Sequence, residues 1–168
     1  MAEEAMAAAD TLQDAAQRLE AGEHVSGPAA ARYTNGALAF RREFEGTFLT
    51  LGQMAALRRN PAFRIYDNAE RAMACVYDQA TALCHPERER GGTTDLTRTP
   101  DLTRCRDNCA NRARTDTHAE QLRAEIERLR AEAASPLTPE PIGRRLQSRA
   151  SHLEHELELH NLQRRGNR

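Results

Sequence analysis

Residues 117–157 carry the strongest structural signal in the chain and read THAEQLRAEIERLRAEAASPLTPEPIGRRLQSRASHLEHEL. The first half spaces its apolar residues by three and four, as on one face of a helix. These residues are Ala119, Leu122, Ile126, Leu129 and Ala133. After Ser135-Pro136-Leu137 a second stripe follows at Ile142, Leu146, Ala150, Leu153 and Leu157. The connection is short, so we predict that residues 115–168 form an antiparallel helical hairpin.

Residues that commonly cap helix N-termini precede both helices of this hairpin. Thr117 and Glu120 match a capping box for the first helix, while Thr138 and Pro139 suit the start of the second. Leu159 and Leu162 fall off the main stripe of the second helix. They would cover the core beyond the hairpin or meet a second chain, so a homodimer is one predicted arrangement.

Residues 1–60 are predicted to form an N-terminal helical region. An Ala-rich stripe over residues 2–21 ends at Gly22, and a second helix should run from Pro28 to about Phe44. Gly36 should weaken that second helix near its middle. Thr50 and Gln53 match a capping box for a short third helix, which Asn60-Pro61 would end.

Residues 61–114 are predicted to form a β-ribbon followed by a cysteine-containing loop. Residues 63–66 alternate between apolar and polar side chains, and residues 72–77 form an apolar stretch; together they suit two strands of a hairpin. A lone two-stranded ribbon is marginal in water, so it needs a helix or a metal to hold it. From His85 to Arg114 the chain is loop-like, which is unusual inside a compact domain. Something must therefore tie the two ends of the loop.

The four cysteines sit at both ends of this loop. Cys75 and Cys84 form one pair, and Cys105 and Cys109 form the other. Two pairs separated by a loop are the general pattern of a tetrahedral zinc site, although Cys-x8-Cys is wider than usual. Zinc binding supplies about 10–16 kcal/mol in small zinc peptides, enough to order such a segment. Unliganded thiols and another metal or redox role are the alternatives, and His85 is a conceivable substitute ligand.

A complete set of four thiolates would leave no open position on Zn²⁺, so the metal would be structural. Around the cysteines, arginines slightly outnumber acidic residues. Arg104, Arg106, Arg112 and Arg114 are candidate contacts to DNA phosphates, which would make binding depend on salt. A solvated loop explains the same arginines equally well.

Composition excludes several functional classes. The net charge of −1 creates no global attraction to nucleic acid or to a membrane surface. No apolar run approaches the roughly 20 residues that span a bilayer, so no membrane partner is expected. The N-terminus is acidic where a signal peptide is basic, which favours a cytoplasmic protein with reduced or metal-bound cysteines.

Familiar catalytic motifs are missing from the sequence. It contains no GxxxxGK[ST] or GxGxxG phosphate loop and no GxSxG nucleophile elbow. His152, His155 and His160 accompany acidic residues near the C-terminus, where we interpret them as polar positions on an exposed helix. The sequence therefore predicts a protein that is not an enzyme.

Three stretches together resemble a known but poorly characterised region. They are Cys75-Val76-Tyr77-Asp78 through Ala82-Leu83-Cys84, then Pro100-Asp101-Leu102 with Cys105-Arg106-Asp107-Asn108-Cys109-Ala110-Asn111, then Ala113-Arg114-Thr115-Asp116. They resemble a cysteine-containing region in proteins of mobile elements that carry tyrosine recombinases (integrases). That region is either the C-terminal part of a long recombinase-type protein or a separate small neighbour. The resemblance covers roughly residues 45–165.

One departure limits what the resemblance implies. Tyrosine recombinases need His-x-x-Arg followed by a nucleophilic tyrosine. His85-Pro86-Glu87-Arg88 fits the first part, but Tyr33, Tyr66 and Tyr77 all precede it. The resemblance therefore implies a non-catalytic accessory protein for DNA integration or recombination that acts by binding DNA or the recombinase. The alternative is a helical protein–protein interaction module without a nucleic-acid role.

Overall fold

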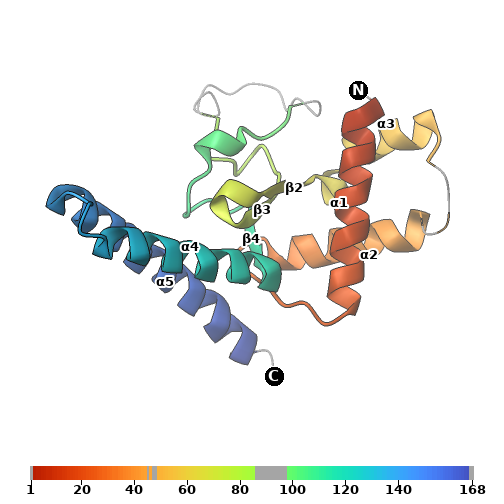
Figure 1. Cartoon of the computed structure of the whole chain (residues 1–168). Helices are drawn as coiled ribbons and strands as arrows, with labels where there is room; N and C mark the ends of the chain where they lie inside the picture. The colour runs from red at the N-terminus through yellow and green to blue at the C-terminus, as the bar shows by residue number, and fades with distance from the viewer. Residues whose placement is uncertain (1, 45, 47–48, 86–97, 167–168) are drawn as a thin grey trace.

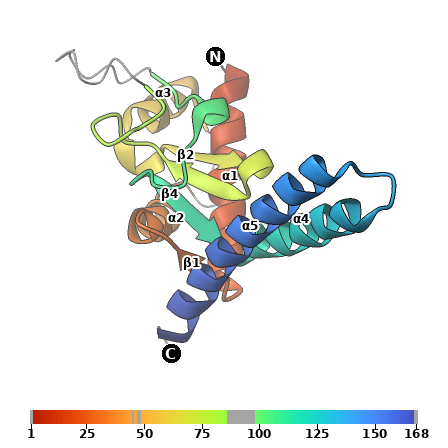
Figure 2. The same ribbon diagram turned by 90° about the vertical axis from the view of Figure 1, so that its left-hand side faces the viewer.

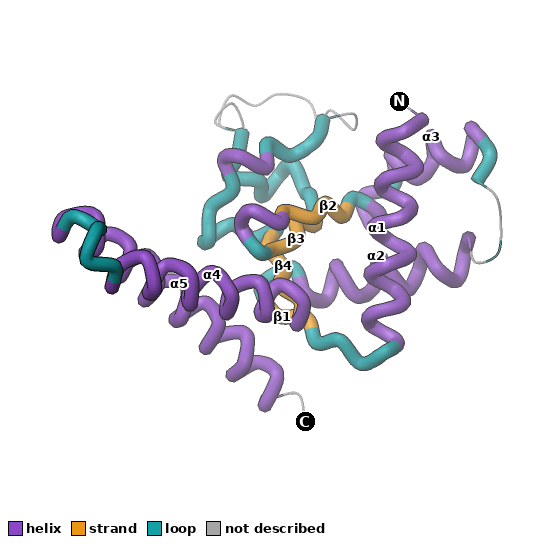
Figure 3. Tube along the Cα trace, in the orientation of Figure 1, coloured by secondary structure: helices purple, strands orange, loops and turns teal. Residues whose placement is uncertain are grey.

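The computed structural model describes residues 2–44, 46, 49–85 and 98–166. Over these residues it confirms the predicted mainly helical class (Figures 1 and 3). The α-helices are α1 (Ala2–Glu20), α2 (Ala30–Phe44), α3 (Leu51–Arg59), α4 (Asp116–Ala134) and α5 (Glu140–Gly166). The stretch of the predicted cysteine loop from residue 86 to residue 97 lies outside the described residues.

A small antiparallel sheet occupies the middle of the molecule. Its strands are β1 (Val25–Ser26), β2 (Ile65–Asn68), β3 (Met73–Val76) and β4 (Arg112–Thr115), in the order β1-β4-β3-β2. The predicted hairpin is confirmed as β2 and β3, but the sequence predicted neither β1 nor β4. The two-stranded ribbon is therefore part of a larger sheet. This is consistent with the expectation that a two-stranded ribbon by itself is only marginally stable in water.

The N-terminal helices pack on one side of this sheet (Figures 1 and 2). Both helices bury side chains there, among them Leu12 and Ala16 of α1 and Tyr33 and Ala37 of α2. Phe40, Phe44 and Phe63 form a group of tilted and edge-on aromatic contacts in the same core. One hydrophobic core thus joins α1, α2 and α3 to β2, β3 and β4.

The predicted antiparallel hairpin is confirmed as α4 and α5, which project from the body of the molecule (Figures 1 and 2). It has a small core of its own around Ile126, Leu129 and Ala150. The predicted cap at Thr117 is wrong: Thr115 caps α4 and forms the capping box with His118. Thr117 instead donates from its backbone N–H to Glu23 Oε1, at 2.9 Å.

Candidate metal centre

Strand β3 supplies the first cysteine. Cys75 pairs with Tyr66 of β2 on one side and with Arg112 of β4 on the other. Successive strand residues face opposite sides of a sheet. Ala74 and Val76 accordingly join the main core, while Cys75 and Tyr77 join a separate small cluster with Ala82 and Cys84. Cys75 and Cys84 are both buried.

Asn111 ties together the two ends of the segment that carries the cysteines. Its side-chain nitrogen donates to Asp78 O at 2.8 Å, and its side-chain oxygen accepts from Thr81 Oγ1 at 2.7 Å. Asn111 is itself buried, at 1% exposure. The sequence analysis expected a link between the two ends of the cysteine loop. The side chain of Asn111 provides part of that link, and the sequence did not predict it.

Short turns carry the second cysteine pair back to the sheet. Asn68 of β2 donates to Leu102 O at 2.9 Å and so holds the 3₁₀ turn Leu102–Arg104 just before Cys105. The N–H of Cys109 donates to Arg106 O, and the N–H of Arg112 donates to Cys109 O. Cys109 therefore lies one turn before the β4 residue that pairs with Cys75.

Cys75 interacts electrostatically with each of the other three cysteines. Burial raises the pKa of the Cys75 thiol, and the charges of Cys105, Cys109 and Cys84 raise it further. Burial also raises the pKa of Cys105, where Cys84 and Cys109 add to the effect and a hydrogen bond with Asn68 opposes it. Charges influence one another in this way at short range, on the order of 10 Å or less. All four cysteines are free of disulfide bonds.

These sulfur atoms do not close a coordination shell. In the part of the chain that the structure describes, no group of three or more His, Cys, Asp or Glu side chains is arranged to hold a metal ion. The four-cysteine zinc loop predicted from the sequence is thus not formed in this conformation, although its members lie near one another. The predicted substitute ligand, His85, has its Nε2 atom 3.0 Å from Thr99 O.

The four candidate phosphate-binding arginines divide into two pairs. Arg104 and Arg106 are exposed beside Cys105. Arg114 is 5% exposed, and its guanidinium binds Glu156 Oε2 at 2.7 Å and Ala72 O at 3.0 Å. Arg112 is ion-paired with the same Glu156 carboxylate. Arg112 and Arg114 lie two apart on β4 and share the face that α5 covers, so their positions do not fit the predicted phosphate contacts.

The sequence interpretation missed a buried hydrogen-bonded chain at the far end of α5. Ser26 Oγ lies 2.6 Å from His160 Nδ1, and His160 Nε2 lies 3.0 Å from Asp116 Oδ1. His160 is 1% exposed, so its prediction as an exposed helix position is wrong. Its place three residues beyond Leu157 continues the apolar stripe of α5, a signal that could have identified it.

Serine, histidine and aspartate are also the members of a nucleophilic triad. Here Ser26 is 5% exposed and His160 is more deeply buried, so a substrate could not reach the hydroxyl in this conformation. Gln163 adds a further link, because its Oε1 accepts from the N–H of Gly27 at 2.9 Å. We therefore interpret these contacts as the attachment of α5 to β1.

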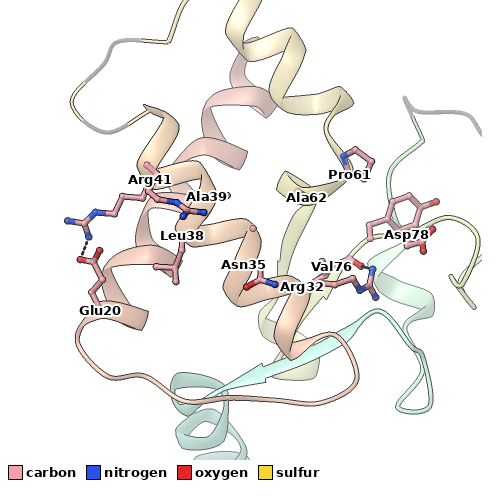
Figure 4. Close-up of a pocket in the computed structure, with 13 residues that line it drawn as sticks. Glu20, Arg32, Asn35, Leu38, Ala39, Arg41, Pro61, Ala62, Val76 and Asp78 are labelled. Atoms are coloured by element: carbon pink, nitrogen blue, oxygen red, sulfur yellow. Dashed lines mark hydrogen bonds and ion pairs between the residues drawn. The ribbon is translucent and has the colours of Figure 1, made fainter.

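A groove of about 830 Å³ opens between α2 and the segments around residues 61 and 77 (Figure 4). Its floor is largely apolar and includes Gly36, Ala39 and Ala62. Arg41 forms an ion pair with Glu20 at one end. Arg32 is held at the other end by Val76 O and by Asn111 Oδ1. Among the described residues that line the groove there is no cysteine or histidine, but Tyr77, which packs with Cys75 and Cys84, is one of them.

Comparison of the chain with protein-family profiles, curated proteins and solved structures finds no match. Among the described helices, none combines the length and apolar character needed to cross a membrane.

Proposed function

We propose that this chain is a non-catalytic accessory protein whose cysteine segment is held against the sheet by a structural Zn²⁺ ion. Cys75, Cys84, Cys105 and Cys109 would bind the ion. The observation that supports this most is that three separate parts of the chain bring these cysteines near one another: β3, the segment after it and the turn before β4.

The chemistry of the four side chains suits zinc. Burial raises the pKa of Cys75 and of Cys105, so without a metal both side chains are neutral thiols near pH 7. Zn²⁺ would take these side chains as thiolates, with their protons released to solvent. When bound, it would cross-link two ends of a segment that buries few apolar side chains.

The resemblance to proteins of recombinase-bearing mobile elements supplies the wider role in this proposal. The module would act in DNA integration or recombination by binding DNA or the recombinase. Arg104 and Arg106 are the exposed candidates for DNA contact, and zinc at Cys105 would fix the backbone that carries them. The alternative role, a helical protein-interaction module, is favoured by exposed apolar side chains of the hairpin, namely Leu137, Ile142, Leu159 and Leu162.

Metal content tests the zinc part of the proposal. Native mass spectrometry of the full chain should find one Zn²⁺ per chain, and Cys75→Ser and Cys105→Ser should each lose it. His85→Gln is the control and should keep the metal, because His85 is not a ligand in the proposed site. Less than about half an equivalent of zinc in the unaltered protein would contradict four-thiolate coordination.

Salt-dependent binding tests the nucleic-acid part. The double variant Arg104→Gln, Arg106→Gln should weaken duplex DNA binding and reduce the slope of log affinity against log salt by about two. Arg123→Gln, on the hairpin, should leave both quantities nearly unchanged. If neither DNA nor a recombinase binds at low salt, the recombination role is lost and the interaction-module alternative stands.

A further inference from the structure

Tyr77 directly follows β3 and lies among the cysteines. It is 1% exposed and shares a small cluster with Cys75 and Cys84. Its ring meets the ring of Tyr66 edge-on at 6.4 Å between centroids and the ring of His85 at 5.9 Å. The guanidinium of Arg64 lies over its face, 4.6 Å from the centroid. These contacts hold the Tyr77 ring in place.

The Tyr77 hydroxyl is a buried donor without an acceptor. Its oxygen is enclosed, and it has no hydrogen-bond partner within the described parts of the chain. Leaving a buried hydroxyl unpaired is unfavourable, and native proteins rarely do so without a reason.

Arg64 is a second buried side chain with a polar atom that lacks a hydrogen-bond partner among the described residues, and it carries a positive charge. It is 6% exposed, its Nε atom also lacks a partner, and no described carboxylate forms an ion pair with it. Its Nη2 donates to the backbone oxygen of Arg98. A buried charge normally has an opposite charge nearby. Four thiolates around one Zn²⁺ carry a net charge of about −2, and their sulfur atoms accept hydrogen bonds.

A loaded zinc centre would therefore supply both missing partners. We propose that Tyr77 is a positioning residue of this centre, whose hydroxyl donates a hydrogen bond to the Cys84 thiolate. Arg64 holds the Tyr77 ring in place and offsets the negative charge of the centre. This inference rests on the proposed zinc site and adds to it a residue that binds no metal but orients a ligand.

The test uses the full chain loaded with Co²⁺, whose thiolate-to-metal charge-transfer band reports on the sulfur ligands. Tyr77→Phe should bind Co²⁺ and Zn²⁺ about 10–100-fold more weakly, as expected when a residue behind a ligand is lost. Its band should move to lower energy, because a thiolate without the hydrogen bond gives up electron density more readily. A purely structural role would not move the band. Tyr66→Phe removes the same atom from the neighbouring ring and should change neither quantity.

The outcomes separate this inference from the zinc site itself. If the unaltered protein binds no metal, the proposed function fails and this inference fails with it. If the unaltered protein binds metal but Tyr77→Phe matches it in affinity and band energy, only the role of Tyr77 is overturned.

A second variant covers the case in which Tyr77→Phe does not fold. Replacing Tyr77 by 3-fluorotyrosine keeps the hydroxyl and makes it a stronger donor. The band should then move to higher energy, and an unmoved band would overturn the proposal.

Discussion

Gly36 shows how one missing side chain shapes the main core. The sequence indicates only that this residue weakens a helix, since glycine has more conformational freedom to lose than alanine. In the structure, the backbone of Ala62 packs directly against α2 at this position. A Cβ atom built on Gly36 would overlap the carbonyl oxygen of Ala62. The glycine therefore permits a close approach between α2 and the turn that leads into β2.

Gly36→Ala should accordingly destabilise the protein by about 1–3 kcal/mol, the usual cost of overpacking. Urea unfolding measures this as a lower midpoint at unchanged slope. Gly52→Ala is the matched control: Gly52 lies in α3 with open space around it, so the change should be neutral or stabilising by at most about 1 kcal/mol. Equal shifts for both variants would show that the contact with Ala62 is not the cause.

Helix α5 is fastened to the sheet through Glu156. The carboxylate of Glu156 binds both Arg112 and Arg114 of β4, and all three side chains are at most 15% exposed. Removing one partner of a buried ion pair leaves an uncompensated charge, which costs far more than the intact pair contributes. The contact therefore makes the docking of α5 on β4 specific.

Glu156→Gln should cost about 3–5 kcal/mol in the free energy of unfolding, since two guanidiniums lose their counter-charge. Calorimetry or urea unfolding measures the loss. Glu154→Gln, two residues away, breaks a pair with the exposed Arg130 and should cost no more than about 1 kcal/mol. A small effect at both positions would mean that solvent reaches Glu156 in solution.

His24 makes the other end of α5 sensitive to pH. Its ring lies 5.3 Å from that of His160. Burial lowers the pKa of His24, His160 and Arg164 of α5 lower it further, and Asp116 of α4 opposes them. The unfolded chain therefore takes up a proton first as the pH falls. The contribution of His24 to stability is complete above its unfolded pKa of about 6.5 and is lost as the pH drops from there toward the folded value.

Thermal unfolding between pH 8 and pH 5.5 should therefore show a falling midpoint. His24→Gln should flatten this dependence, because the titrating ring is gone. His155→Gln removes an exposed histidine of α5 and should leave the slope as it is. An equally steep slope in His24→Gln would assign the effect to another group.

Local and distant interactions explain which elements could be predicted. The hairpin is encoded by spacing within 41 consecutive residues, 117–157, so periodicity and capping predict it. Strand β4 depends on pairing with β3 and β1, from distant parts of the chain, and its sequence Arg112-Ala113-Arg114-Thr115 resembles a polar loop. The same limit applies to the cysteines. Their spacing predicts a shared site, whereas the hydrogen bonds of Asn111 and the burial of Tyr77 are seen only in the folded structure.

The described residues form two larger hydrophobic cores, and the cysteine segment packs beside them. The main core joins the N-terminal helices to the sheet, and the hairpin core lies between α4 and α5. The cysteine segment contributes a much smaller cluster, to which Tyr66 and Leu102 add partly buried surface. His152 of α5 links it to the hairpin through Asp107, at 2.8 Å. Zinc would thus stabilise this segment much more than either core.

In a hydrogen-exchange experiment, Cys105→Ser should affect the cysteine segment but not the hairpin. Amides of residues 78–85 and 98–111 should exchange faster, because the segment loses its cross-link and has little apolar burial to replace it. Amides in the middle of α4 and α5 should keep their protection, since Ile126, Leu129 and Ala150 still pack against one another. A strong chelator should reproduce this pattern in the unaltered protein and add nothing in the variant. Faster exchange in the hairpin before the cysteine segment would mean that the hairpin depends on the metal centre for its stability.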